Sequence, residues 1–236
     1  MLPHQVKAIF FDAAGTLFTV NGSVGDIYAR IARDHDKEVA VSDLEKGFRR
    51  CFAAASPMAF PGAEPEQILT LEKHWWRSLV QEAFAPLGPF PAFEAYFEAL
   101  FHFFAQAEAW RLYPETLSTL AALQDQGFRL GVISNFDSRL FNILDGFDIA
   151  RFFDPVIIST RAGAAKPDRG IFSLALAQAR VDAQEALHIG DSYEADVVGA
   201  RAAGLASVLV DRRMQEKEAN DCFTVGNLKD LLEIVE

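Results

Sequence analysis

Short runs of apolar residues mark the start of the chain and its second half. The first run, Val6 to Phe11 (VKAIFF), is rich in aromatic and branched residues and is followed by Asp12. Continuous apolar runs of this kind are typical of strands buried on both faces of a parallel sheet. Similar runs return after a long interval and then follow one another closely: Leu130 to Ser134, Pro155 to Ser159, Ala186 to Ile189, Ala206 to Val210 and, more weakly, Cys222 to Val225.

Helical patterns fill the gaps between the later strands. They cover Glu115 to Gln126, Arg139 to Ile143, Gly170 to Ala179, Glu194 to Ala203 and Leu228 to Val235. Apolar strands that alternate with helices predict a parallel sheet with helices on both faces. We therefore expect an α/β core with a Rossmann-like, doubly wound parallel sheet, built from residues 1–18 and 109–236.

The residues between the first two strands have helical periodicity and no convincing strand. The sequence Ser42 to Glu45 (SDLE) is a capping-box signature, which predicts the start of a helix. Longer helices are predicted over Glu64 to Phe84 and over Ala92 to Ala107, on either side of a proline-rich break. We therefore expect residues 19–108 to form an all-helical domain inserted after the first strand.

Three features of this insert leave alternatives open. Many of the 21 phenylalanines fall in it, and they either form the core of a helical bundle or, in part, line an apolar substrate pocket. The loop from Ser56 to Gly62 either faces an active site or merely joins two helices. The connections near Phe18 to Gly22 and Ala107 to Pro114 are the expected hinges between the two domains.

The charge balance disfavours several classes of partner. With 33 acidic and 22 basic residues, the chain carries a formal net charge of −11, which argues against binding to nucleic acid or to an anionic membrane. No apolar segment approaches the roughly 20 residues of a membrane-spanning helix, and the start of the chain lacks a signal-peptide pattern. The two cysteines, Cys51 and Cys222, have no paired spacing, which is typical of a reducing compartment, so we expect a cytoplasmic protein. We expect it to be a monomer or a homodimer.

Polar motifs follow four of the predicted strands. They are Asp12 to Thr16 (DAAGT), Ser134–Asn135, Lys166–Pro167, and Gly190 to Ser192 with Asp196 beyond it. In open α/β sheets, ligands bind at the carboxyl ends of the strands. Each motif alone is common as a turn, a helix cap or a solvated charge. Together they supply carboxylates, a hydroxyl, an amide-rich turn and a lysine, and this combination predicts a single site.

This set of side chains is suited to phosphoryl transfer with a metal ion. Asp12 and Asp191 at neighbouring strand ends would form a hard oxygen site for Mg²⁺, and a carboxylate can also act as a covalent nucleophile. Lys166 would relieve the repulsion between the two acids. The Ser134 hydroxyl and nearby backbone amides are suited to hold phosphoryl oxygens, and the insert can close over the site to exclude water.

The ordered motifs resemble those of the haloacid dehalogenase-like hydrolase superfamily. The resemblance runs through Asp12 to Leu17 (DAAGTL), Val132 to Asn135 (VISN), Lys166–Pro167 and Ile189 to Asp196 (IGDSYEAD), and the insert is similar to the superfamily's helical cap. It implies a core sheet of strand order 5-4-1-2-3, with the first strand in the centre. It also implies a covalent aspartyl intermediate, Mg²⁺ as cofactor and a small phosphorylated or other small-molecule substrate.

The resemblance also implies roles for individual positions. Asp12 would be the nucleophile, Ala14 would offer only its backbone carbonyl to Mg²⁺, and Thr16 would help to hold the nucleophile loop at the phosphate site. The other motif residues would bind the transferred group, balance charge or bind metal: Ser134 and the Asn135 amide at the transferred group, Lys166 between nucleophile and phosphoryl oxygen, Asp191 as a metal ligand, and Asp196 as a ligand or a partner of one.

Ala14 departs from the pattern of the superfamily's phosphatases. These usually carry a second Asp two residues after the nucleophile, which protonates the leaving group and later activates water. General acid–base assistance of this kind is worth roughly 10²–10⁴-fold. With Ala14 in that place, the expected protein is a phosphatase of low or specialised activity. The alternative is a non-catalytic protein that binds phosphate or a partner.

Two family variants that lack the second Asp keep hydrolysis of phosphonates or haloacids open. Phosphonate-cleaving members show the pattern Asp-x-Ala-Gly-Thr, which this chain matches at Asp12 to Thr16, but they also need a cap lysine that forms a Schiff base. Lys37, Lys46 and Lys73 are the lysines of the insert. Haloacid dehalogenases carry a tyrosine where this chain has Ala14, and they work without metal.

Overall fold

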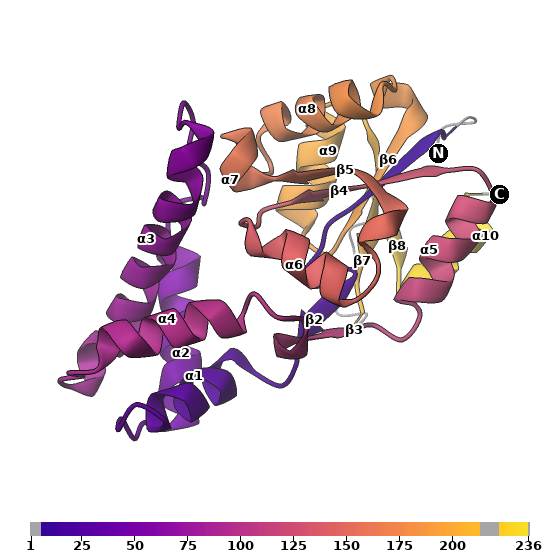
Figure 1. Ribbon diagram of the computed structural model, residues 1–236. Coiled ribbons are helices and arrows are strands. Elements are labelled where there is room, and N and C mark those ends of the chain that lie inside the picture. Colours follow the sequence, from indigo (N-terminus) through magenta and orange to yellow (C-terminus); the bar gives the residue numbers. More distant parts are fainter. Residues whose placement is uncertain (1–5, 213–221, 236) are drawn as a thin grey trace.

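A parallel β-sheet forms the centre of the core in the computed structural model, which describes residues 6–212 and 222–235. Its strand order is β5-β4-β1-β6-β7-β8, and neighbouring strands run parallel (Figure 1). The expected order, with the first strand in the centre, is confirmed, and β8 extends the sheet at one edge. The strands are β1 (Ala8–Phe11), β4 (Arg129–Ser134), β5 (Phe153–Ile158), β6 (Ala186–Gly190), β7 (Ala206–Val210) and β8 (Phe223–Val225).

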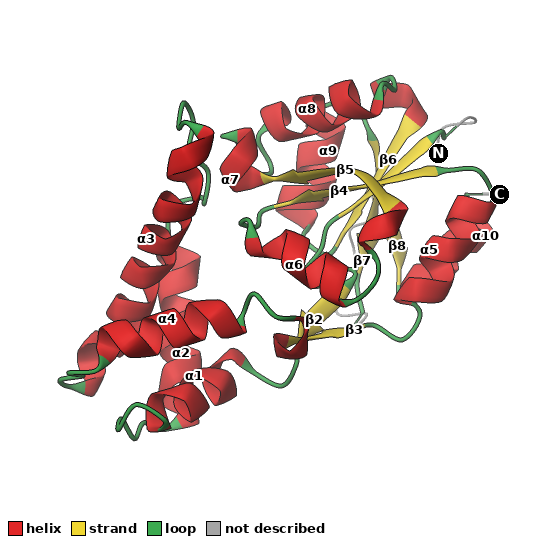
Figure 2. Cartoon of the chain, in the orientation of Figure 1, coloured by secondary structure: helices red, strands yellow, loops and turns green. Residues whose placement is uncertain are grey.

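Helices cover both faces of this sheet, as expected for a doubly wound fold (Figure 2). One face packs against α5 (Thr116–Asp125), α6 (Arg139–Gly146) and α10 (Leu231–Ile234). The opposite face packs against α8 (Arg169–Ala179) and α9 (Gly199–Ala202). Successive side chains of β1 alternate between the two apolar layers, which accounts for its uninterrupted apolar sequence.

Some short elements differ from the expectation. The helix expected over Glu194 to Ala203 is a π-helix, Tyr193–Val198, that continues into α9; such π turns are frequent at functional sites. Ser159, expected at the end of a strand, starts the short helix α7 (Ser159–Ala162), because the chain turns out of the sheet there. Turns of 3₁₀ helix occupy Ala85–Leu87, Ala107–Ala109, Ala150–Phe152, Ala183–Glu185 and Leu228–Asp230.

The inserted segment is helical and lies beside the end of the sheet at which β1 leads into β2 (Phe18–Val20; Figure 1). It contains α1 (Val24–Arg33), α2 (Val41–Ala54), α3 (Pro65–Phe84) and α4 (Phe93–Phe103). Apolar side chains from each of these helices form a core that is separate from the core of the sheet. None of the helices within residues 6–212 and 222–235 is long and apolar enough to cross a lipid bilayer.

The capping box expected at Ser42 to Glu45 is wrong. Helix α2 begins already at Val41, with Ala40 in the N-cap position and no side-chain cap. The Glu45 carboxylate instead accepts a 2.8 Å hydrogen bond from the backbone amide of Gly25 in α1. The Glu45 side chain, which the local pattern predicted as part of a helix cap, therefore joins α2 to α1 instead.

The two connections expected as hinges pair with each other. Strands β2 (Phe18–Val20) and β3 (Trp110–Leu112) form an antiparallel ladder in which Phe18 lies opposite Leu112. Three-residue strands are too short to show an alternating pattern, so the sequence did not predict them. The two crossings between core and insert are consequently tied together by backbone hydrogen bonds.

The expected domain boundaries fall at this ladder. The helices α1 to α4 lie within residues 19–108, and the parallel sheet lies within residues 1–18 and 109–236. This division of the chain into two domains stays a prediction. Within the expected core, three stretches lie outside the described residues: 1–5, 213–221 and 236.

Candidate active site

Three strand ends and one loop bring the predicted site residues together. Asp12 follows β1, Ser134 ends β4 and Asp191 follows β6, and β1 lies between the other two strands. Lys166 reaches the same place from the loop after α7, where it is 5% exposed. The Asp12 amide donates a 2.8 Å hydrogen bond to the Ile189 carbonyl, which ties the start of the first motif to β6. The carboxyl edge of the sheet therefore gathers these side chains at one point.

Lys166 lies between two carboxylates. Its Nζ donates hydrogen bonds to Asp12 Oδ1 at 2.7 Å and to Asp196 Oδ1 at 2.6 Å. The Ser134 hydroxyl donates a further bond to Asp12 Oδ1 at 2.9 Å. A buried ammonium group is tolerated only when it is paired in this way. These contacts fix the position of the Asp12 carboxylate and of the positive charge beside it.

Burial and mutual repulsion set the protonation of the acids. Burial raises the pKa of Asp12 against the opposing charge of Lys166. Withdrawal from bulk water and the charges of Asp12 and Asp196 raise the pKa of Asp191 to about 7. Burial would also raise the pKa of Asp196, but Lys166 and His188 hold that pKa well below its ordinary value. Three acids face one lysine, and this excess of negative charge favours a bound cation.

The acids also have the placement that a divalent cation requires. Asp12, Asp191 and Asp196 each offer a carboxylate oxygen, and these oxygens lie within 4.8 Å of one another. Two glycines leave room for them: a Cβ on Gly15 would lie 2.2 Å from Asp191 Oδ2, and a Cβ on Gly190 would lie 2.1 Å from Asp196 Cγ. Hard oxygen donors are the ligands that Mg²⁺ prefers. The residues present therefore fit this ion.

Two further side chains hold the charged groups in place. The Asn135 side chain donates from Nδ2 to the Lys166 carbonyl at 2.9 Å and accepts from the Lys166 amide at 2.7 Å. His188 Nε2 in β6 lies 2.8 Å from one Asp196 oxygen, and the Ser192 amide donates to the other at 2.9 Å. A direct bond from the Asn135 backbone amide to the transferred group stays a prediction. Sequence analysis missed His188, whose only signal was a polar residue inside the apolar run ALHI.

A cavity of about 570 Å³ extends from these residues into the helical insert. The loop from Ser56 to Gly62 contributes to its lining, so this loop does more than join two helices. The Ser159 hydroxyl donates a 2.7 Å bond to the Met58 carbonyl and anchors the loop on the core. Phe97 and Phe101 belong to the core of the insert and also line the cavity, so the two expected placements of the phenylalanines do not exclude each other. That the cavity binds a substrate stays a prediction.

Ala14 and Thr16 of the first motif differ in their access to this cavity. Ala14 lines it beside Asp12, and its methyl group has no proton to donate. Thr16 is fully buried, its hydroxyl has no partner among the described residues, and it is not part of the cavity lining. Arg212, which sequence analysis missed, donates to the Thr16 carbonyl and to the Glu115 carboxylate, each at 2.6 Å. Contact between Thr16 and phosphate stays a prediction.

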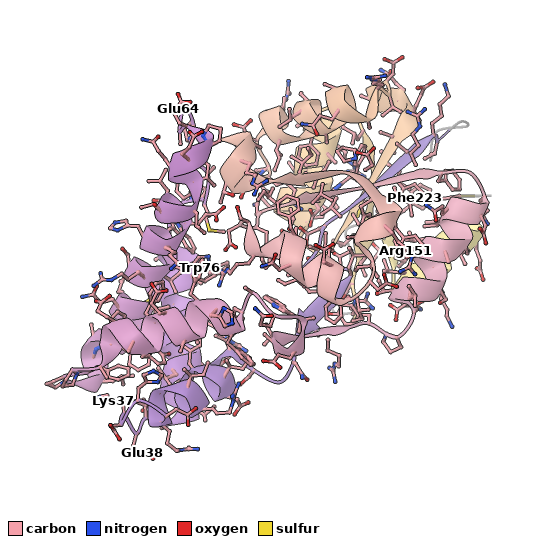
Figure 3. All side chains as sticks on the ribbon, viewed as in Figure 1. Lys37, Glu38, Glu64, Trp76, Arg151 and Phe223 are labelled. Carbon is pink, nitrogen blue, oxygen red and sulfur yellow. The ribbon has the colours of Figure 1, made fainter. Side chains whose placement is uncertain are left out.

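Contacts from α3 hold the insert against the core. Trp76 Nε1 donates a 2.6 Å bond to Asp137 Oδ2, and Figure 3 shows Trp76 on the side of α3 toward the core. The buried Glu72 carboxylate accepts bonds from the Ser138 amide at 3.0 Å, the Ser138 hydroxyl at 2.9 Å and the Thr160 hydroxyl at 2.6 Å. Sequence analysis singled out none of these contacts, because their partners lie 61 to 88 positions apart.

The fold and the acid cluster together define a hydrolase-like site at the edge of a parallel sheet. The family model of the haloacid dehalogenase-like hydrolases matches residues 6–204, and the chain therefore belongs to this family. It is 37% identical over 208 residues to haloacid dehalogenase-like hydrolase domain-containing protein 3 of Bos taurus, which covers 87% of this chain and 82% of that protein.

Two further comparisons extend this result. The chain is 32% identical over 258 residues to the glyceraldehyde 3-phosphate phosphatase of Methanothermobacter thermautotrophicus, covering 98% of this chain and 100% of that one. Among solved structures, the HAD-hydrolase YfnB from Bacillus subtilis, bound to magnesium, matches with a TM-score of 0.75 at 18% identity over 98% of this chain and 99% of its own. At that identity the structural likeness concerns the fold alone.

Proposed function

We propose that this chain is a Mg²⁺-dependent phosphatase of low or specialised activity that uses Asp12 as a covalent nucleophile. The observation that carries the proposal is the contact of Lys166 Nζ with both Asp12 and Asp196, next to Asp191. Membership of a hydrolase family supports bond cleavage. A relative named as a phosphatase of glyceraldehyde 3-phosphate supports a small phosphorylated substrate.

In this proposal the phosphoryl group binds at the core end of the cavity. Lys166 and the Ser134 hydroxyl, which already surround Asp12 Oδ1, donate hydrogen bonds to its oxygens. A carboxylate oxygen of Asp12 attacks phosphorus, and the ester P–O bond breaks with its electron pair on the leaving oxygen. The product of this step is an aspartyl phosphate at position 12 and a free alcohol once the leaving oxygen gains a proton.

The acid cluster and the Ala14 carbonyl would hold Mg²⁺, whose chemistry is to offset negative charge on the phosphoryl oxygens. Water then attacks the phosphorus of the aspartyl phosphate, which releases phosphate and restores the Asp12 carboxylate. Ala14 cannot protonate the leaving oxygen or take a proton from this water. Solvent must do both, and the missing assistance is worth roughly 10²–10⁴-fold. This deficit is the reason for a low or specialised activity.

The cap lysines argue against phosphonate hydrolysis. None of Lys37, Lys46 and Lys73 belongs to the lining of the cavity as the described residues form it. The Nζ of Lys37 donates to the Leu87 carbonyl at 2.7 Å, and Lys73 forms an ion pair with Glu98 at 2.7 Å. Among the described residues, no lysine of the insert is therefore placed to form a Schiff base at this site, and we do not include phosphonates in the proposal.

Hydrolysis of 4-nitrophenyl phosphate, with and without Mg²⁺, tests the proposal. Release of nitrophenol that needs Mg²⁺ and falls by at least about 10³-fold in Asp12→Asn supports the enzyme. Asp125→Asn, which makes the same change at an exposed position near the end of α5, should keep full activity. Equal traces in all three proteins would overturn the enzyme and leave the second candidate, a non-catalytic phosphate- or partner-binding protein, which Ala14 favours.

We also propose a setting for this activity. Residues 19–108 act as a cap over the site, and the protein works in the cytoplasm on a small molecule. Helices of this segment that line the same cavity as Asp12 support the cap. The free cysteines Cys51 and Cys222 support a reducing compartment.

A further inference from the structure

The half of the cavity formed by the insert and its connections is aromatic. All three tryptophans of the chain, Trp75, Trp76 and Trp110, line it. Phenylalanines join them from two helices, including Phe52 of α2 and Phe101 of α4. The rings of Phe52 and Trp76 stack with their centroids 6.2 Å apart. Flat aromatic walls of this kind favour a ligand that carries a ring.

This half of the cavity offers no unpaired charge to a ligand within the described residues. Apart from the acid–lysine group at the core end, the charged residue in the lining is Arg139. Its Nε and Nη2 already donate to the Asp137 carboxylate at 2.9 and 2.6 Å. Its guanidinium carbon lies 4.2 Å from the ring centre of Phe101 and 4.9 Å from that of Trp76. An ammonium or a second carboxylate on the ligand would be buried here without a partner.

Two hydrogen-bond donors on this wall have no acceptor among the residues that the structure describes. Tyr28 lines the cavity, is 2% exposed, and its hydroxyl donates to no described residue. The hydroxyl oxygen is not completely buried, and since Tyr28 lines the cavity, this oxygen opens onto it. Burial raises the pKa of Tyr28, which keeps the donor protonated. The Nη1 of Arg139 likewise donates to no described residue, because the two hydrogen bonds of its guanidinium use Nε and Nη2.

We propose that the substrate is the phosphate monoester of an uncharged, ring-bearing alcohol with a hydrogen-bond acceptor such as a carbonyl or ether oxygen. The ring packs against the aromatic wall, and the acceptor receives hydrogen bonds from Tyr28 and Arg139. The inference rests on the proposed phosphatase function and names its substrate class. Small polyhydroxylated or zwitterionic phosphates fit poorly, because their hydroxyls and charges would lie against rings without partners.

Turnover of two phosphates of primary alcohols tests the preference for a ring while leaving-group basicity stays similar. The kcat/KM for benzyl phosphate should exceed that for glyceraldehyde 3-phosphate by at least about tenfold, since full burial of one ring is worth more than this factor. An equal or higher kcat/KM for glyceraldehyde 3-phosphate would overturn the inference and leave the phosphatase standing.

Binding of phosphonates, whose C–P bond resists this chemistry, separates the inference from the proposed function. Quenching of tryptophan fluorescence reports binding, because all three tryptophans line the cavity. Benzylphosphonate should bind at least about tenfold more tightly than methylphosphonate. This preference without turnover of either ester would overturn the phosphatase and support the aromatic pocket. Equal binding of the two phosphonates would overturn the pocket, whatever the turnover.

Single substitutions locate the binding. Phe52→Ala removes part of the wall at a residue that is 50% exposed, so the fold should survive, and it should weaken benzylphosphonate binding by roughly fivefold without affecting methylphosphonate. Leu69→Ala, at a 54% exposed residue of α3 outside the cavity lining, should change neither.

A second substitution tests the acceptor. The wild-type protein should bind 4-acetylbenzylphosphonate more tightly than benzylphosphonate. Tyr28→Phe should reduce that difference, because Arg139 alone still donates to the acetyl oxygen, and it should leave benzylphosphonate binding unchanged. An undiminished preference for the acetyl ligand in Tyr28→Phe would overturn the assignment of Tyr28 as a donor to the ligand.

Discussion

The two ends of the cavity are built from opposite kinds of contact. At the core end, Asp12 Oδ1 receives hydrogen bonds of 2.9 and 2.7 Å from Ser134 and Lys166, each placed by a strand end or a buried loop. At the insert end, rings surround two donors that have no acceptor within residues 6–212 and 222–235. The first end holds one charged group in one geometry, whereas the second leaves its hydrogen bonds to the ligand. In the proposed function, chemistry and substrate choice therefore belong to separate parts of the chain.

The largest loss of stability and activity is expected from Lys166→Met at the core end. Without the ammonium, Asp12 and Asp196 are buried without their shared partner, so the free energy of unfolding should fall by about 3–5 kcal/mol. The kcat/KM should fall by about 10³-fold. Urea unfolding and steady-state kinetics measure the two losses. Lys46→Met, at an exposed residue of α2, is the control; a Lys166→Met protein as stable as this control would contradict the role of the ion pair.

A gain of function is expected from Ala14→Asp, again at the core end. The new carboxyl group can protonate the leaving oxygen, and turnover of benzyl phosphate should rise by about 10²-fold. Ala14→Asn has a similar shape without the acid and should give no gain. If both variants are equally slow in a phosphate-release assay, a missing acid is not what limits this site.

A smaller effect is expected where the two ends meet. Trp76→Phe keeps a ring in the wall but loses the hydrogen bond to the Asp137 carboxylate, and the free energy of unfolding should fall by about 1.5–3 kcal/mol because the acceptor is charged. Trp75 Nε1 donates to a backbone carbonyl, that of Ser56, at 3.0 Å, so Trp75→Phe should cost only about 1 kcal/mol. Equal losses in urea unfolding would show that the carboxylate adds nothing.

The smallest effect is expected from Thr160→Val, which removes a hydroxyl from the Glu72 carboxylate. Burial raises the pKa of Glu72, and the bond from Thr160 opposes that rise. A raised pKa means that the folded protein holds the Glu72 proton more tightly than the unfolded chain does. Stability from this group is therefore lost as the pH rises through the interval between its unfolded and folded pKa.

Loss of the Thr160 hydroxyl widens that interval. The free energy of unfolding of Thr160→Val should fall by about 1 kcal/mol, and by more at pH 8 than at pH 4. Thr160→Ser keeps the hydroxyl and serves as the control in unfolding measured at both pH values. A loss that is the same at pH 4 and pH 8 would mean that the hydroxyl does not act on the ionised form of Glu72.

The sheet and its acid edge were predictable because the signals are local. Strands β1, β4, β6 and β7 are buried on both faces and show as continuous apolar runs. Asp12 and Asp191 follow such runs directly, and parallel strands place their carboxyl ends on one edge. The meeting of Asp12, Lys166 and Asp196 followed from chain order and the family resemblance rather than from any single motif.

The remaining features depend on contacts that no local pattern records. The Trp76–Asp137 bond joins residues 61 positions apart, and His188 sits in a strand whose neighbours are apolar. Glu45 shows the reverse case: the local sequence predicted a capping box, but its carboxylate bonds to Gly25 of another helix. The position of the Tyr28 hydroxyl on the cavity wall could not be predicted, because a tyrosine at a buried helical position is as easily a core residue.

The bonds between α3 and the core end close to Ser134 in the sequence. Asp137 accepts the bond from Trp76, and Ser138 donates to Glu72. Both residues lie in the short loop that follows Ser134 at the end of β4. Movement of α3 away from the core would break these bonds and free this loop. In the proposed function, a molecule too bulky for the aromatic wall would then bind without correct placement of the Ser134 hydroxyl at Asp12, so that poor substrates would differ from good ones in kcat rather than in affinity.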